Sequence, residues 1–154
     1  MMPISVQYER PAYELVEGLR EPAQPLAVSR AEPSGWARQA SVLRKLGPKA
    51  WVRVSLFRNY FASGWGENGR VLSPRALDAF FRFVEGATFP TGNRSPSVFL
   101  TDRGGIELCW EDRNGSPVQV EFTGGGIEYY EAATDEEGVV AFDGLAHLSQ
   151  RLSA

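Results

Sequence analysis

Three short segments in the second half of the chain alternate apolar and polar residues with a period of two. They cover residues 106–111, 118–122 and 127–130. Their apolar positions are Ile106, Leu108, Trp110, Val118, Val120, Phe122, Ile127 and Tyr129. Such alternation is typical of antiparallel strands with one buried and one solvated face. The pattern therefore predicts a sheet with an apolar face and a polar face.

Turn residues between these segments predict how the strands pair. A three-residue loop at 113–115, with Gly115 left-handed, keeps apolar positions opposite one another, whereas a two-residue turn would oppose apolar and polar faces. A tight turn at Gly124 and Gly125 suits the next connection, since glycine adopts positive φ freely. The predicted opposite pairs are Trp110 and Val118, Leu108 and Val120, Ile106 and Phe122, Phe122 and Ile127, and Val120 and Tyr129.

The sheet is expected to extend by one strand on each side. A loop at 102–104, similar to the one at 113–115, would set Val98 against Leu108 and Leu100 against Ile106. A fifth short strand is expected at 139–142, after the polar stretch 134–138. The predicted fold is α+β, with an antiparallel meander of four to five strands and helices packed on one face.

Two helices are expected before the sheet segments. Ser34 is a suitable N-cap for a helix that ends at about Leu46, before Gly47 and Pro48. Its expected apolar stripe is Trp36, Ala40, Leu43 and Leu46. Residues 50–61 fit either a helix, with Ala50, Val54, Phe57 and Phe61 on one side, or a strand with Val52, Val54 and Leu56 on one face; their length favours the helix.

The strongest helix signal spans residues 73–86, where Ser73 is the cap and Pro74 occupies the first turn. Leu77, Phe80, Phe81 and Val84 form an apolar stripe that should cover the apolar sheet face, while Phe83 lies off that stripe. A short final helix is expected to be capped by Asp143. Its buried edge would be Leu145, Leu148 and Leu152.

The first 33 residues contain five prolines, and this spacing of prolines forbids a long helix there. We therefore divide the chain into an N-terminal arm, residues 1–33, and one α+β domain, residues 34–154. A glycine-rich loop around Trp65 lacks the Lys-Ser/Thr that closes a P-loop, so we expect Trp65 to fill a gap between helix and sheet.

Composition excludes several classes of protein. Of 154 residues, 43% are hydrophobic, enough for one core, yet no apolar run could span a bilayer and no signal peptide is visible. A cytoplasmic protein without a cofactor is the expectation. Cys109 is the single cysteine and His147 the single histidine, so the sequence predicts neither a disulfide nor a zinc site. Glutamates beside Cys109 should raise the pKa of its thiol.

Charge is distributed unevenly along the chain, although the net charge is only −3. Residues 97–142 hold ten acidic and two basic side chains, whereas residues 34–66 hold no acidic one. This second region holds six basic side chains: Lys49 and the five candidates for a nucleic-acid surface, Arg38, Arg44, Lys45, Arg53 and Arg58. Two interpretations are open: this segment packs near the acidic sheet, which we prefer, or it binds nucleic acid together with Trp36, Trp51 and Tyr60.

The predicted registers place Glu107, Glu121 and Glu128 side by side on the polar face, beside Gln119 and Tyr130. Carboxylates directly opposite one another destabilise a sheet slightly. Three interpretations are open: a solvated row, a docking surface for a basic protein, or a divalent-cation site that would serve a metal-dependent enzyme. A flat sheet face converges ligands poorly, so we assign no metal ligand and no catalytic residue.

A tryptophan-glycine loop at Gly64-Trp65, the Ser73-Pro74 helix and the hairpin Gly104-Gly105-Ile106-Glu107-Leu108-Cys109-Trp110 occur together in this chain. This combination resembles a pattern in small, mostly uncharacterised bacterial proteins, some of which look like one half of a toxin–antitoxin module. The resemblance covers about residues 60–131 and implies no functional residue. We expect a cytoplasmic, non-enzymatic module of antitoxin, immunity or adaptor type that binds a basic partner through the glutamate row.

Overall fold

The computed structural model describes residues 35–60 and 69–153. The chain divides between Gly35 and Trp36, and the description below concerns the second unit. Four features predicted from the sequence lie outside the described residues: the N-terminal arm, the Ser34 cap, Phe61 and the Trp65 loop.

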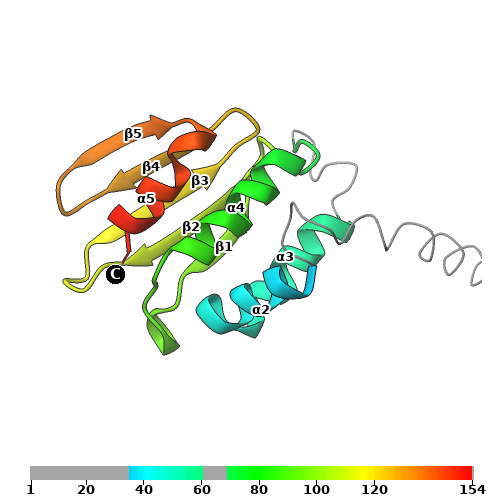
Figure 1. The fold of residues 1–154 in the computed structure, drawn as a ribbon, viewed down its shortest axis with the longest axis horizontal. Coiled ribbons are helices and arrows are strands. Elements are labelled where there is room, and N and C mark those ends of the chain that lie inside the picture. The colour runs from blue at the N-terminus through cyan, green and yellow to red at the C-terminus, as the bar shows by residue number, and fades with distance from the viewer. Residues whose placement is uncertain (1–34, 61–68, 154) are drawn as a thin grey trace, which may run out of the picture. The chain divides into compact units, whose positions relative to one another are not determined.

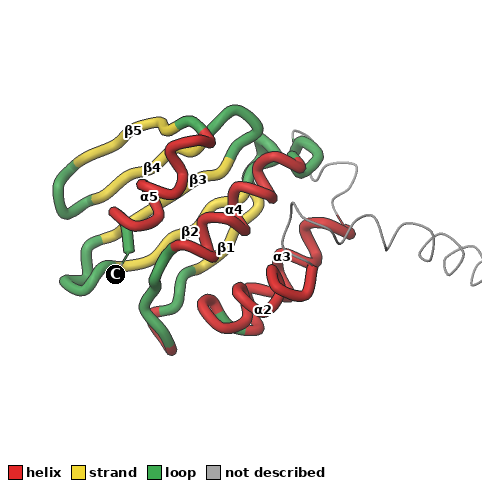
Figure 2. The backbone as a smooth tube through the Cα atoms, in the orientation of Figure 1, coloured by secondary structure: helices red, strands yellow, loops and turns green. Residues whose placement is uncertain are grey.

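The predicted α+β fold is confirmed: helices pack against a five-stranded antiparallel sheet whose strand order is β1-β2-β3-β4-β5 (Figures 1 and 2). The strands are β1 Ser97–Leu100, β2 Ile106–Glu111, β3 Pro117–Phe122, β4 Ile127–Glu131 and β5 Glu136–Val140. The α-helices are α2 Gly35–Leu46, α3 Pro48–Tyr60, α4 Pro74–Gly86 and α5 Leu145–Arg151, and two short 3₁₀ helices are η2 Gly92–Arg94 and η3 Phe142–Gly144.

Every predicted strand register is confirmed. Trp110 lies opposite Val118, and Val98 lies opposite Leu108. Gly115 and Gly104, with φ of +82° and +76°, provide the left-handed residues that close the loops at 113–115 and 102–104. The meander follows because loops of this length keep the buried residues of neighbouring strands opposite one another.

The turn between β3 and β4 lies where it was expected, but the groups that stabilise it differ from those predicted. Thr123 N–H donates to the Gly126 carbonyl at 2.9 Å, and the Thr123 hydroxyl oxygen accepts bonds from the N–H groups of Gly125 and Gly126. Neither Gly124 nor Gly125 has a positive φ. The threonine side chain, rather than left-handed glycine, therefore organises this turn.

The fifth strand begins earlier than predicted, at Glu136 instead of Val139, and Phe142 belongs to η3. The chain reverses at once after β4: Asp135 N–H donates to the Ala132 carbonyl, and Asp135 itself has a φ of 52°. Asp135 thus stays in the turn, whereas Glu136 and Glu137 are strand residues, with Glu136 facing the helices and Glu137 facing away from them.

Helices α4 and α5 lie on one face of the sheet (Figure 1). The Ser73 hydroxyl oxygen accepts the Ala76 N–H at 3.3 Å, so the predicted cap of α4 is confirmed. Phe83, off the predicted stripe, is fully buried and contacts the Phe122 ring with centroids 5.3 Å apart. The buried face of α4 is therefore wider than four positions.

The final helix buries Leu145, Leu148 and Leu152, as predicted. Its predicted cap is wrong, because Asp143 lies within η3 and the residue that precedes α5 is Gly144, without a side-chain cap bond. His147 lies on this helix and is exposed.

Residues 48–60 are helical, as favoured, and Ala50, Val54 and Phe57 are buried. The stripe predicted for α2 is wrong except at Leu46. Trp36 is 80% exposed, and Ala40 and Leu43 are also exposed, while Val42 joins Leu46 in the core. The helix is rotated because its polar residues bind α4: the Arg38 guanidinium donates to Asp78 Oδ1 at 2.6 Å.

Candidate functional site

The face of the sheet opposite α4 and α5 carries two straight rows of side chains, one residue from each strand. The first row is Phe99, Glu107, Glu121, Glu128 and Val139. The second row is Ser97, Cys109, Gln119, Tyr130 and Glu137. We call this surface, with Glu111 at the end of β2, the open face.

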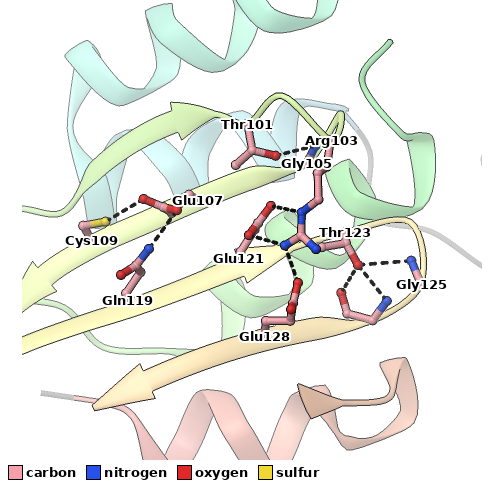
Figure 3. Close-up of polar contacts among 11 residues, drawn as sticks. Thr101, Arg103, Gly105, Glu107, Cys109, Gln119, Glu121, Thr123, Gly125 and Glu128 are labelled. Carbon is pink, nitrogen blue, oxygen red and sulfur yellow. Dashed lines mark hydrogen bonds and ion pairs between the residues drawn. The ribbon is translucent and has the colours of Figure 1, made fainter. Parts of the chain in front are cut away.

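The three glutamates predicted to form a row do so. Glu107 lies opposite Glu121, and Glu121 lies opposite Glu128. Figure 3 shows the three carboxylates on the same side of the sheet, and no described helix lies over the central strands on this side (Figure 1). Gln119 and Tyr130, predicted to flank the row, are exposed beside it.

Arg103, which sequence reasoning did not include in the site, bonds two of the three glutamates. Its guanidinium donates to Glu121 Oε2 at 2.5 Å and also to Glu128 Oε2 (Figure 3). These bonds raise the pKa of Arg103 further above its already high ordinary value, and burial opposes them in part. Arg103 therefore offsets the repulsion between the Glu121 and Glu128 carboxylates. The Glu121 side chain is only 15% exposed.

Glu107 has neutral neighbours instead. Gln119 Nε2 donates to Glu107 Oε2 at 2.9 Å, and the Cys109 thiol donates to Glu107 Oε1 at 3.1 Å. Neither donor carries a charge that offsets the carboxylate. Within the row, Glu107 is thus the member whose charge is least compensated by its immediate contacts.

The pKa of the Cys109 thiol is raised to about 12, first by burial and then by the hydrogen bond and the charge of Glu107. The direction predicted from the sequence is confirmed. A thiolate is the reactive form of cysteine, so Cys109 is a poor nucleophile at neutral pH.

We expect iodoacetamide to alkylate Cys109 in the folded protein about a thousandfold more slowly at pH 8 than a cysteine of pKa 9.0. Glu107→Gln removes one cause of the raised pKa and should accelerate alkylation about tenfold. Glu111→Gln, on the same strand and face but exposed, should leave the rate unchanged. Mass spectrometry of timed samples measures the rates, and equal rates for both variants would contradict this role of Glu107.

The open face holds only a shallow hollow of about 160 Å³, lined by Gln119, Glu121, Glu128, Tyr129 and Tyr130. Small-molecule sites usually enclose about 300–1,000 Å³. Among residues 35–60 and 69–153, no group of three or more His, Cys, Asp or Glu side chains is arranged to hold a metal ion. A larger hollow of about 590 Å³ lies away from the glutamates, between the start of α3 and residues 92–98.

The basic segment contacts both α4 and the edge strand β1, and its bonded basic side chains reach neighbours other than the glutamate row. Arg38 binds Asp78, and Lys45 Nζ donates to the carbonyls of Glu85 and Ala87 at 2.6 and 2.8 Å. Arg53 lies over the Phe99 ring at 5.1 Å, at the β1 end of the open face. Of the five basic residues of the nucleic-acid alternative, Arg38 and Lys45 are half-buried in these contacts, while Arg44, Arg53 and Arg58 are exposed.

A second ion-pair cluster, on the helix side, was also missed by sequence reasoning. Arg151 of α5 bonds Glu131 and Glu136, and the Tyr129 hydroxyl donates to Glu136 Oε1 at 3.0 Å. The Tyr129 and Arg151 hydrogen bonds lower the pKa of Glu136. This cluster joins α5 to β4 and β5, so its acids are structural partners of α5 and do not contribute to the open face.

In the part of the chain that the structure describes, no helix has both the length and the apolar character needed to cross a membrane. No protein-family model matches the chain, and no curated protein or solved structure shows significant similarity to it.

Proposed function

We propose that this protein is a non-enzymatic, cytoplasmic module that binds a basic partner protein through the open face, in the manner of an antitoxin, an immunity protein or an adaptor. The observation that supports this most is the combination of uncompensated charge with exposed apolar and aromatic side chains on one sheet face. Phe99, Tyr130 and Val139 are exposed there, around the glutamate row.

Charge on this face favours a basic partner. Five strand residues of the open face are glutamates, and the described residues set two cations against them, Arg103 on Glu121 and Glu128 and Arg53 over Phe99 at the β1 end. The glutamates are Glu107, Glu111, Glu121, Glu128 and Glu137. A surface with this excess accelerates encounter with a basic partner and repels acidic ones.

Within the row, Glu107 is the most favourable contact for a cation on the partner. Glu121 and Glu128 already bind Arg103, so a partner cation would gain less there. Tyr130 and Phe99 would contribute contact area on either side, since tyrosine and phenylalanine are enriched in protein interfaces.

The experiment is affinity capture by the full chain from a lysate of its native host, followed by identification and purification of the captured protein. Binding is then measured by calorimetry at several salt concentrations. Glu107→Arg should weaken binding at least about tenfold and reduce its salt dependence, because a cation replaces the charge that attracts the partner.

The matched control is Asp143→Arg, which changes the net charge equally but lies in η3, outside the open face. It should bind like the original protein. Equal loss of affinity in both variants would show that net charge alone attracts the partner, and unchanged affinity in Glu107→Arg would refute the proposed surface.

A further inference from the structure

The outer edge of β5 carries backbone groups that bond no described residue. Gly126 and Ala132 flank β4, and their backbone groups point toward β3: the Gly126 carbonyl accepts the Thr123 N–H, and the Ala132 N–H donates to the Pro117 carbonyl. Backbone groups alternate in direction along a strand, so Glu128 and Tyr130 also point toward β3, and Ile127, Tyr129 and Glu131 point toward β5. Their partners on β5 are Val140, Gly138 and Glu136. The N–H and C=O groups of Glu137 and Val139 therefore point away from the sheet.

The two edges of the sheet differ in protection. Helix α3 packs along β1, where Val98 is fully buried. Among the described elements none lies beyond β5, which forms the other margin of the sheet (Figure 1). An unpaired strand edge is a template for an additional strand from another chain.

The side chains at this edge indicate which chain it would accept. Val139 is 74% exposed and lies on the open face with Glu137, two residues away. No described residue bonds the Glu137 carboxylate, and β5 contains no basic residue. Across this edge, a strand bearing a basic residue opposite Glu137 and an apolar one opposite Val139 would satisfy the backbone, the charge and the exposed methyl groups.

We propose that β5 accepts an extended segment of a partner protein as a sixth strand, with a lysine or arginine two residues from a β-branched residue. This inference rests on the proposed function and names how the basic partner docks. A second copy of this chain is a poorer occupant, because β5 contains no basic residue. Antiparallel pairing of two β5 strands through Glu137 and Val139 would set each Glu137 opposite a valine and leave its charge without a cation.

The probe is a phage-displayed library of random dodecapeptides, selected on the full chain. Enriched peptides should share the basic and β-branched pattern, and synthetic copies should bind in fluorescence titrations. Among the backbone groups of β5, Val139→Pro removes the outward N–H alone, and Gly138 before it has no Cβ to clash with the proline ring. It also replaces the valine side chain, which the control below addresses. We expect it to weaken peptide binding at least about tenfold, because the peptide carbonyl loses its donor.

Val139→Thr is the matched control: it keeps the N–H and the β-branched shape, and should lose less than about threefold. Glu137→Lys, which leaves the backbone intact, should lose about tenfold and more at low salt, even if Val139→Pro proves unstable. Failure to enrich such peptides, or full binding by both Val139→Pro and Glu137→Lys, overturns the inference. A dimer of the free chain that Val139→Pro dissociates also overturns it.

The captured partner separates this inference from the function on which it rests. Loss of that partner by Glu107→Arg but not by Val139→Pro or Glu137→Lys would leave the open face as the binding surface and reject strand addition. Loss by none of the three would reject both. Loss by the β5 variants as well as by Glu107→Arg is the result we expect.

Discussion

Replacing Phe83 with alanine is expected to destabilise the domain by about 3–5 kcal/mol. Phe83 is fully buried, and its ring contacts the rings of Phe89, Trp110 and Phe122, with centroids 6.1, 6.4 and 5.3 Å away. These residues join α4 to β2, β3 and the segment after α4. Alanine would remove most of the side chain and leave a cavity that the surrounding rings fill only partly.

The measurement is urea denaturation followed by far-UV circular dichroism, with a thermal melt in which the midpoint falls by about 10 °C or more. Phe99→Ala is the matched control, since Phe99 is an exposed phenylalanine on the open face that contacts Arg53. It should cost less than about 1 kcal/mol. Comparable losses for the two variants would contradict the assignment of Phe83 to the centre of the core.

The sheet was predictable because several local signals constrain the same strand registers. A shift of one residue in either loop would turn Leu108 or Val120 to solvent, so alternation and loop length together fix each register. Gly104 and Gly115 support the same solution through their left-handed backbones. The positions of Glu107, Glu121 and Glu128 followed directly from those registers.

Helix α2 was harder to predict because its sequence allows more than one rotation. Trp36, Leu43 and Val42 compete for the buried side, and nothing in the helix itself decides between them. The choice depends on α4, where Asp78 binds Arg38 and the carbonyls of Glu85 and Ala87 accept bonds from Lys45. Such contacts join residues about forty positions apart, which a periodicity confined to one segment does not contain.

The charge balance of the open face was missed for a related reason. Arg103 lies in a loop, and its long side chain reaches strands that are 18 and 25 residues further along the chain. Sequence spacing predicts neighbours on one strand or across a hairpin but not the reach of a loop arginine. The predicted row of three carboxylates is correct in position. Because Arg103 binds Glu121 and Glu128, the carboxylate without a bonded cation is that of Glu107.

Gly104→Ala is expected to destabilise the domain by about 2–4 kcal/mol, through two separable effects. Gly104 has a φ of +76°, and a Cβ on it would lie 2.3 Å from the Val71 carbonyl oxygen, a backbone atom that cannot rotate away. The same loop is held by a bond from Ser73 N–H to the Gly104 carbonyl at 2.8 Å. Relief of the clash therefore moves the loop that carries Arg103.

Gly115→Ala separates the two effects. Gly115 has nearly the same backbone, with a φ of +82°, but a Cβ there meets nothing within 4 Å. It should cost only about 1 kcal/mol, the penalty for a left-handed alanine. Urea denaturation of both variants measures the difference, which isolates the steric contact with Val71. Equal losses would mean that the loop tolerates the extra methyl group, and that its close approach to Val71 does not hold Arg103 over Glu121 and Glu128.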